Sequence, residues 1–389
     1  MRRIGPAVGG AVVLIVAMSI GRFAYTPILP YMRDVDGLST AAAGWVASAN
    51  YLGYLLGAAT ARPLSGAFGL RTTMRVGLVL SVLSTLGMAA TSDALPWAAL
   101  RLAGGAASAW AMIAVAAIVL GAAGADRRRA ANVMFAGVGV GIVVSTLAIA
   151  VCAGGSDDPA RMWTTLGLAS AGAALLADRL VLRAAAPRPV ATPRITRVPL
   201  PTDVRLLVAS YACAGFGYVI TATYLVLIVR ESDLGRGLEV VTWCVVGAFS
   251  AVSTVLVARL GAITGERRAL VVAHALQAAG VLSAAFVPGT AGVLIGATLL
   301  GATFAGITGV GVDLAGRMHP ADPTRAIAVM TTAFAVGQML GPAIGGWLAD
   351  RTGTFGVPSI VAAAVLLAGG GILLVRSTRD APAGVRVRA

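Results

Sequence analysis

Residues 4–21, IGPAVGGAVVLIVAMSIG, form a stretch of 18 residues without a charge near the start of the chain. A bilayer core about 30 Å thick is crossed by about 20 apolar residues in a helix that rises about 1.5 Å per residue. Arg2 and Arg3 before the stretch give it a superficial similarity to a signal peptide, but it exceeds the usual apolar region of about 7–15 residues. It therefore predicts a first, retained membrane-spanning helix.

The whole chain has the composition of a membrane protein. Of its 389 residues 58% are hydrophobic and 12% charged, and its mean hydropathy is +0.87. Soluble domains have roughly 45–50% apolar and about 25% charged residues, and disordered chains are less hydrophobic still. The sequence predicts an all-α membrane protein with 12 transmembrane helices, at about 6–32, 41–61, 73–92, 96–120, 131–153, 163–182, 204–229, 240–260, 268–288, 291–312, 326–349 and 357–375.

A polar segment divides these twelve runs into two sets of six. Residues 184–203, AAAPRPVATPRITRVPLPTD, contain five prolines and three arginines, which neither a helix nor a membrane span tolerates. We expect three parts: an N-terminal six-helix bundle (1–183), a cytoplasmic linker (184–203), and a C-terminal six-helix bundle with a short basic tail (204–389).

Charge predicts the orientation of the chain. All 30 basic residues are arginine, and with both termini in the cytoplasm 23 of them lie on the cytoplasmic side, five outside and two within spans. This asymmetry follows the positive-inside rule and predicts a multi-pass protein of the cell membrane. It also accounts for the net charge of +14 without a nucleic-acid partner. Three cysteines without CxxC spacing and the absence of a GxxxxGK[ST] sequence predict no metal, disulfide or ATP site, and we expect no cofactor.

The two halves repeat each other weakly. Three aromatic residues of the first run recur 193 residues later in the seventh run: Phe23, Tyr25 and Tyr31 match Phe216, Tyr218 and Tyr224. Two glycines of the fifth run, Gly137 and Gly141, recur 200 residues later in the eleventh run as Gly337 and Gly341. Repeats of this kind place a solute site near the membrane midplane and allow alternating access by rocking of one half against the other.

Several motifs resemble the major facilitator superfamily over essentially the whole chain. Residues 337–346, GQMLGPAIGG, have its GxxxGPxxGG antiporter pattern, although the superfamily's drug exporters carry it in helix five, where this chain has only Gly137 and Gly141. Arg101 with Gly104 and Gly105 resembles its helix-four arginine motif. Residues 21–30, GRFAYTPILP, with 49–54, ANYLGY, are similar to the YbfB/YjiJ-like branch. The resemblance implies two six-helix bundles related by a pseudo-twofold axis, and gating or coupling roles for Arg101, Gly337, Gly341 and Pro342.

Arg22 is the strongest candidate for solute binding. An arginine at the bilayer centre costs at least about 2.5–3.5 kcal/mol, so it must face a cavity or a partner. Helical spacing places Met18, Arg22, Tyr25 and Leu29 on one face, and a guanidinium there offers two donors to a carboxylate or phosphate. The structural alternatives are hydrogen bonds to carbonyls freed near Pro27, or an acid on another helix, although no acid lies near the midplane.

Other polar groups deep in the runs are further candidates. We expect solute contact from Arg22, Tyr25, Asn50, Tyr54, Trp110, Tyr218 and Gln338, with interhelical packing as the alternative for the uncharged members. Asp313 is the best carboxylate for proton coupling, or else anchors a loop. Arg101 either takes part in coupling or is neutralised by nearby Asp93.

These features predict a secondary transporter that moves a small organic solute by alternating access, through proton-coupled efflux of a metabolite or drug-like compound. The alternative is an uptake permease for an organic anion bound by Arg22. An enzyme is disfavoured because no GxSxG or HExxH sequence and no deep carboxylate pair occurs. We expect a monomer in the lipid bilayer whose partners are the solute and protons.

Overall fold

The computed structural model describes residues 5–182, 199–320 and 322–375, and these contain helices but no strand. The helices form twelve rods. The first combines α1 (Gly5–Leu14), the π-helical η1 (Ile15–Phe23) and α2 (Tyr25–Asp36). The others are α3 (Thr40–Phe68), α4 (Leu70–Gly87) with the 3₁₀ turn η2 (Met88–Ala90), α5 (Ala94–Ala122), α6 (Arg127–Ala153) after the short η3 (Gly124–Asp126), α7 (Pro159–Val181), α8 (Thr202–Glu231), α9 (Arg236–Thr264), α10 (Glu266–Phe286), α11 (Gly289–Met318), α12 (Pro323–Thr352) and α13 (Gly356–Ile372).

Each rod coincides with one of the twelve predicted runs, so the predicted helical membrane fold is confirmed. By length and composition alone, nine rods of the described chain are long and apolar enough to cross a bilayer. The exceptions are α3, α7 and α13, of which α13 has 17 residues. The polar side chains of Asn50, Tyr51 and Tyr54 lower the hydropathy of α3.

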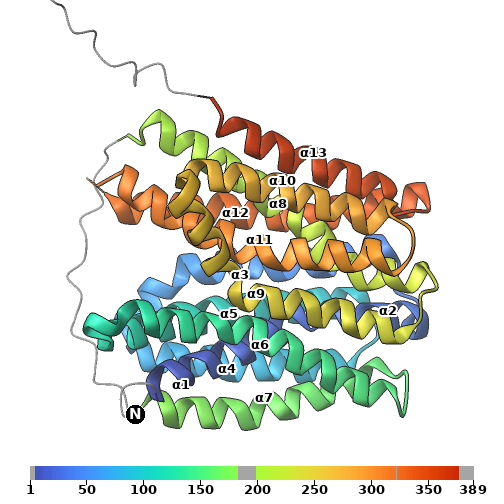
Figure 1. Cartoon of the computed structure of the whole chain (residues 1–389). Coiled ribbons are helices and arrows are strands. Elements are labelled where there is room, and N and C mark those ends of the chain that lie inside the picture. The colour runs from blue at the N-terminus through green and yellow to red at the C-terminus, as the bar shows by residue number, and fades with distance from the viewer. Residues whose placement is uncertain (1–4, 183–198, 321, 376–389) are drawn as a thin grey trace, which may run out of the picture.

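The rods of the two halves lie in two groups (Figure 1). In that view α1, α4, α6 and α7 lie in the lower part and α8, α10 and α13 in the upper part, while α3 and α9 lie between them. The start of α1, the end of α7, the start of α8 and the end of α13 share one end of the molecule, here named the terminal end; the opposite end is the distal end. Most of the predicted linker, residues 184–198, and the basic tail beyond Val375 lie outside the described residues, so the domain boundaries stay predictions.

Local signals fix where several rods begin. Ser39 caps α3 by accepting a hydrogen bond from the Ala42 amide at 3.1 Å. Asp158 and Asp322 cap α7 and α12 in the same way, and each is followed by a proline, whose missing N–H costs nothing in the first turn.

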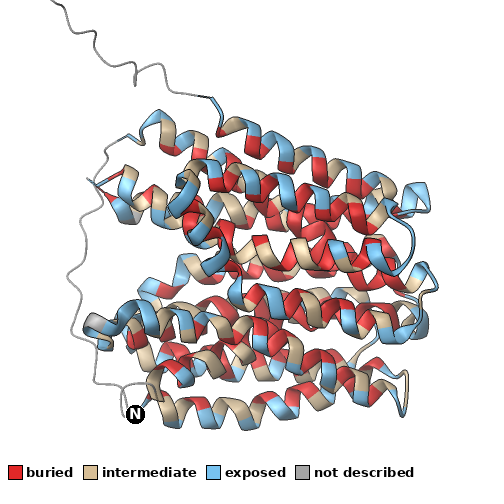
Figure 2. Ribbon diagram, in the orientation of Figure 1, coloured by how far each residue is buried: buried red, intermediate tan, exposed pale blue. Residues whose placement is uncertain are grey.

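Small residues bring the rods close together, and the first rod and α8 are the most buried (Figure 2). Between α3 and α5, a Cβ added at Gly53 would lie 1.9 Å from the Leu102 carbonyl oxygen, and one at Gly105 would lie 2.0 Å from that of Asn50. Between the halves, a Cβ at Gly44 would lie 2.2 Å from the Pro342 carbonyl oxygen. Because lipid is as apolar as leucine, such close packing is a main source of helix association in membranes.

Replacing Gly105 by alanine should separate α3 from α5. Overpacking costs about 1–3 kcal/mol, so Gly105→Ala should lower the thermal unfolding temperature measured in detergent. The matched control is Gly172→Ala in α7, where no atom lies within 4 Å of the new Cβ. The control should unfold at or slightly above the wild-type temperature because alanine favours helix, and equal behaviour of the two variants would contradict the packing.

Candidate functional site

Arg22 lies in a widened turn of the first rod. In η1 the Ala24 amide donates to the Ser19 carbonyl 2.9 Å away, five residues earlier. Pro27 has no N–H to give to the carbonyls four or five residues before it, those of Phe23 and Arg22. Wide turns of this kind are frequent at functional sites, and this one presents a side chain that is only 6% exposed.

Aromatic faces surround the Arg22 guanidinium. Its central carbon lies 4.3 Å from the Tyr54 ring centroid and 4.9 Å from that of Tyr51, both on α3. Nη1 contacts the Met18 sulfur at 3.9 Å. Nε and Nη2 are buried and make no hydrogen bond within the described part of the chain, where Arg22 also has no ion pair. The Tyr51 hydroxyl also approaches the guanidinium closely enough to interact with it. The cation is therefore stabilised by ring quadrupoles, and two of its donors have no acceptor in good hydrogen-bond geometry among the described residues.

The other half supplies a column of rings beside this arginine. Tyr218 on α8 stacks on Phe304 of α11, with centroids 5.5 Å apart, and on Phe334 of α12 at 5.6 Å. The Gln338 amide donates a hydrogen bond to the Tyr218 hydroxyl. Phe23 meets Phe304 edge to face at 6.1 Å and joins the two sets. We name this group the central cluster: Arg22, Phe23, Tyr51, Tyr54, Tyr218, Phe304, Phe334 and Gln338.

Arg101 makes the backbone hydrogen bonds that the sequence offered as a structural alternative for Arg22. It is 5% exposed, and its Nη1 and Nη2 donate to the carbonyls of Gly21 and Arg22 at 2.8 and 3.0 Å. The carbonyls near Pro27 are thus satisfied by Arg101 rather than by Arg22. Asn50 in turn donates to the Arg101 carbonyl at 2.8 Å and is an internal link between α3 and α5.

Like Arg101 and Asn50, the predicted solute or coupling residues Tyr25, Trp110 and Asp313 lie outside the central cluster. Tyr25 faces Arg101 at 4.9 Å and donates to the Ala43 carbonyl, because the wide π turn breaks the three- and four-residue spacing that would align it with Arg22. Trp110 donates to the Thr60 hydroxyl at 3.0 Å. Asp313 pairs with Arg317, and 68% of its side chain is exposed.

The glycine-proline sequence of α12 packs against helices. A Cβ at Gly337 would lie 2.3 Å from the Ala212 carbonyl oxygen, and one at Gly341 would lie 2.7 Å from that of Phe216. The Pro342 carbonyl accepts a hydrogen bond from the Tyr224 hydroxyl at 2.8 Å. These contacts give the motif a packing function within the C-terminal half and next to α3.

Ion pairs join the two halves at the distal end. Arg33 of α2 pairs with Glu231 of α8, and Arg236 of α9 pairs with Asp157 in the loop before α7. The hydrogen bond from Arg236 holds the pKa of the Asp157 carboxyl below its usual value. Together with the close contact of α3 and α12 through Gly44, these pairs close the distal end.

Arg230 is the centre of this closure. Its Nε and Nη2 donate hydrogen bonds to Glu239, and its Nη1 donates to Asp34 of the other half. Its guanidinium carbon lies 4.6 Å from the Tyr31 ring centroid. Glu239 is a buried carboxylate, 4% exposed, that the sequence did not single out.

Ion pairs at the terminal end stay within one half. Arg75 of α4 binds Asp178 of α7 with both Nε and Nη2, at 2.8 and 3.0 Å. Arg317 pairs with Glu266 and Asp313, all in the C-terminal half. Among the described residues, ion pairs therefore connect the two halves at the distal end, whereas those at the terminal end do not connect them.

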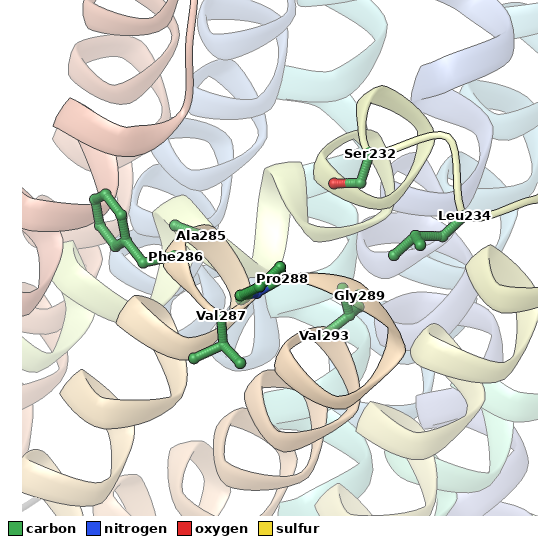
Figure 3. A pocket seen from close by; sticks show the side chains of 9 residues that line it. Ser232, Leu234, Ala285, Phe286, Val287, Pro288, Gly289 and Val293 are labelled. Carbon is green, nitrogen blue, oxygen red and sulfur yellow. The ribbon is translucent and has the colours of Figure 1, made fainter.

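A separate surface cavity of about 310 Å³ lies where α8 ends and α10 turns into α11 (Figure 3). It is lined by the apolar side chains of Leu234, Phe286, Val287, Pro288 and Val293 and by Ser232. No member of the central cluster lines it, so it is not the candidate site. Among the described residues no group of His, Cys, Asp or Glu is arranged to hold a metal ion.

Comparison with known proteins identifies relatives of this fold. The family described as "Uncharacterised MFS-type transporter YbfB" matches residues 14–374. The crystal structure of a mutant nucleoside transporter NupG has a TM-score of 0.76 and 12% identity, covering 96% of this chain and 99% of that chain. A D-xylose-proton symporter has a TM-score of 0.72 and 13% identity, covering 96% and 95%. At such identities these structures show the fold alone, and no curated protein matches the sequence.

Removing Arg230 should loosen the distal end. The bond that crosses between the halves, Arg230 with Asp34, is an exposed ion pair worth about 0.2–1 kcal/mol, so its loss shifts a two-state equilibrium by up to roughly fivefold. In a protein with Cys152, Cys213 and Cys244 replaced by serine, maleimide labelling of Thr26→Cys in detergent should accelerate when Arg230→Gln is added, since Thr26 is buried against α8. The control is Arg161→Gln, an exposed arginine on α7, and labelling at the unaltered rate in Arg230→Gln would refute the closure.

Proposed function

The chain belongs to the family of the MFS-type transporter YbfB, and from this premise and the central cluster we propose that it carries small organic anions across the membrane by alternating access. The predicted resemblance to the superfamily is confirmed by that match and by the fold. The protein is therefore a multi-pass secondary transporter and not an enzyme.

The free edge of Arg22 supports an anionic solute. Nε and Nη2 lie on the same edge of a guanidinium and form a fork that fits the two oxygens of a carboxylate. The chain itself uses this edge elsewhere: Arg75 holds Asp178 with Nε and Nη2, and Arg230 holds Glu239 with the same two atoms. At Arg22 the two donors are buried and unused, so a carboxylate supplied by the solute completes the pair. This observation carries the proposal.

The rings favour a solute with a flat apolar body. Tyr51 and Tyr54 lie within 5 Å of the guanidinium, and the stacked rings of Phe304 and Tyr218 approach from the other half. A planar ring attached to the carboxylate offers these side chains offset or edge-to-face contacts. Because both halves contribute, movement of one half against the other changes the solute's surroundings.

For orientation, we propose that the distal end faces outside and that the terminal end, with both chain termini, faces the cytoplasm of a cell membrane. In this arrangement the ion pairs of the distal end lie on the outer side of the membrane. Proton coupling, export and a monomeric state stay predictions from the sequence, and the packing role of Gly337, Gly341 and Pro342 supports neither direction of transport.

Binding of benzoate tests the anionic solute. Wild-type protein in detergent should bind benzoate, and Arg22→Gln should weaken binding by at least about tenfold because a charge-assisted pair is lost. Isothermal titration calorimetry gives both dissociation constants. Arg22→Lys should fall between them, since an ammonium keeps the charge but not the fork.

Two controls accompany this titration. Benzamide has the size and shape of benzoate without its charge and should bind weakly to every variant. Arg128→Gln, at an exposed position at the start of α6, should bind benzoate as the wild type does. Equal benzoate affinity in wild type and Arg22→Gln would reject Arg22 as the anion site.

Direction is measured separately in proteoliposomes with an imposed pH gradient. Radiolabelled benzenesulfonate is a suitable probe because its fixed charge prevents passive leakage. Movement of the probe against the direction of proton flow would support the predicted antiport, whereas movement with protons would replace it by symport.

A further inference from the structure

Two arginines meet at the same turn of the first rod. Among the described residues Arg101 leaves only its Nε without a hydrogen bond, whereas Arg22 leaves both Nε and Nη2. We propose that Arg101 is a positioning residue. From the neighbouring helix α5 it holds the backbone of the π-helical turn, and it thereby orients the free donors of Arg22 toward the solute. This inference rests on the proposed function of Arg22 as the anion site.

The turn cannot satisfy all of its own carbonyls. In a five-residue hydrogen-bond register the Arg22 carbonyl would accept from residue 27, and in a four-residue register the Phe23 carbonyl would do so; Pro27 can donate to neither. Arg101 supplies donors from α5 instead, to the carbonyls of Gly21 and Arg22 at 2.8 and 3.0 Å. The backbone of Arg22 is thus held by a neighbouring helix rather than by its own.

Arg101 is itself fixed on several sides. Its guanidinium carbon lies 4.9 Å from the Tyr25 ring centroid, and the Tyr25 hydroxyl is anchored on the Ala43 carbonyl at 3.0 Å. Asn50 donates to its backbone carbonyl at 2.8 Å. The close α3–α5 contact at Gly105 sets the distance between the helices that carry Asn50 and Arg101.

The contacts of Arg101 distinguish it from a solute ligand. Both terminal nitrogens are engaged by backbone carbonyls, so its cation is turned toward the first rod. The terminal nitrogens of Arg22 include one that is buried and unused. One guanidinium therefore serves the backbone, and the other is left for a ligand.

Hydrogen–deuterium exchange of the full-length protein in detergent, without ligand, tests the positioning directly. Arg101→Lys keeps the charge but loses the planar pair of donors, and it should raise amide exchange in residues 19–30 by about tenfold, the effect of one charge-assisted hydrogen bond. Adding Pro27→Ala restores an N–H to the turn and should bring exchange in the double variant back toward the wild-type rate. The matched control Arg75→Lys, at the terminal end, should leave residues 19–30 unchanged.

Benzoate titration of the same variants gives the second readout. Arg101→Lys should weaken benzoate binding by about tenfold, and the Pro27→Ala double variant should recover part of this loss. Unaltered exchange in residues 19–30 would overturn the proposal. So would a uniform rise across the N-terminal half with unchanged benzoate affinity, which is the mark of a merely structural arginine. Failure of the wild type to bind benzoate would reject the anionic solute, while the exchange data would still decide the role of Arg101.

Discussion

A buried cation without a carboxylate of its own governs the centre of this protein. Charge is costly in a low-dielectric interior, and Arg22 keeps its charge tolerable through the faces of Tyr51 and Tyr54 rather than through an ion pair. An internal acid would neutralise the guanidinium permanently and close the fork. Aromatic faces stabilise the cation while leaving its hydrogen-bond donors available, which is the condition for reversible capture of an anion.

The rest of the N-terminal half holds this group in place. Glycines bring α3 and α5 into backbone contact, Asn50 ties the two helices together, and Arg101 extends from α5 to the π turn. The C-terminal half meets the site with rings and meets the distal end with ion pairs. Rings tolerate sliding better than ion pairs do, because their contacts have broad geometry while bidentate pairs are directional. Rigid support on one side and adaptable contact on the other suits a site between two moving halves.

Hydrophobic length alone predicted the twelve rods, and the charge in the middle of an apolar run identified Arg22. The neighbours of Arg22 could not be read in the same way. Tyr25 was placed on its face by α-helical spacing, which a π turn breaks. Phe304 and Phe334 carry no polar group to mark them, and their role follows only from tertiary stacking on Tyr218. Glu239 lies near the start of a helix, where sequence position suggests exposure, yet packing buries it against Arg230.

The arginines also show why residue type alone does not separate structure from function. Arg230, Arg101 and Arg22 are all partly or fully buried, but they differ in which donors are occupied. Arg230 donates to Glu239 through Nε and Nη2 and to Asp34 through Nη1, and it connects the two halves at the distal end. Arg101 has both terminal nitrogens on backbone carbonyls and holds a turn. Arg22 has its side edge free. Since each donor left unused in a buried site carries a desolvation cost, the arginine that keeps two of them is the one that we propose to bind the solute.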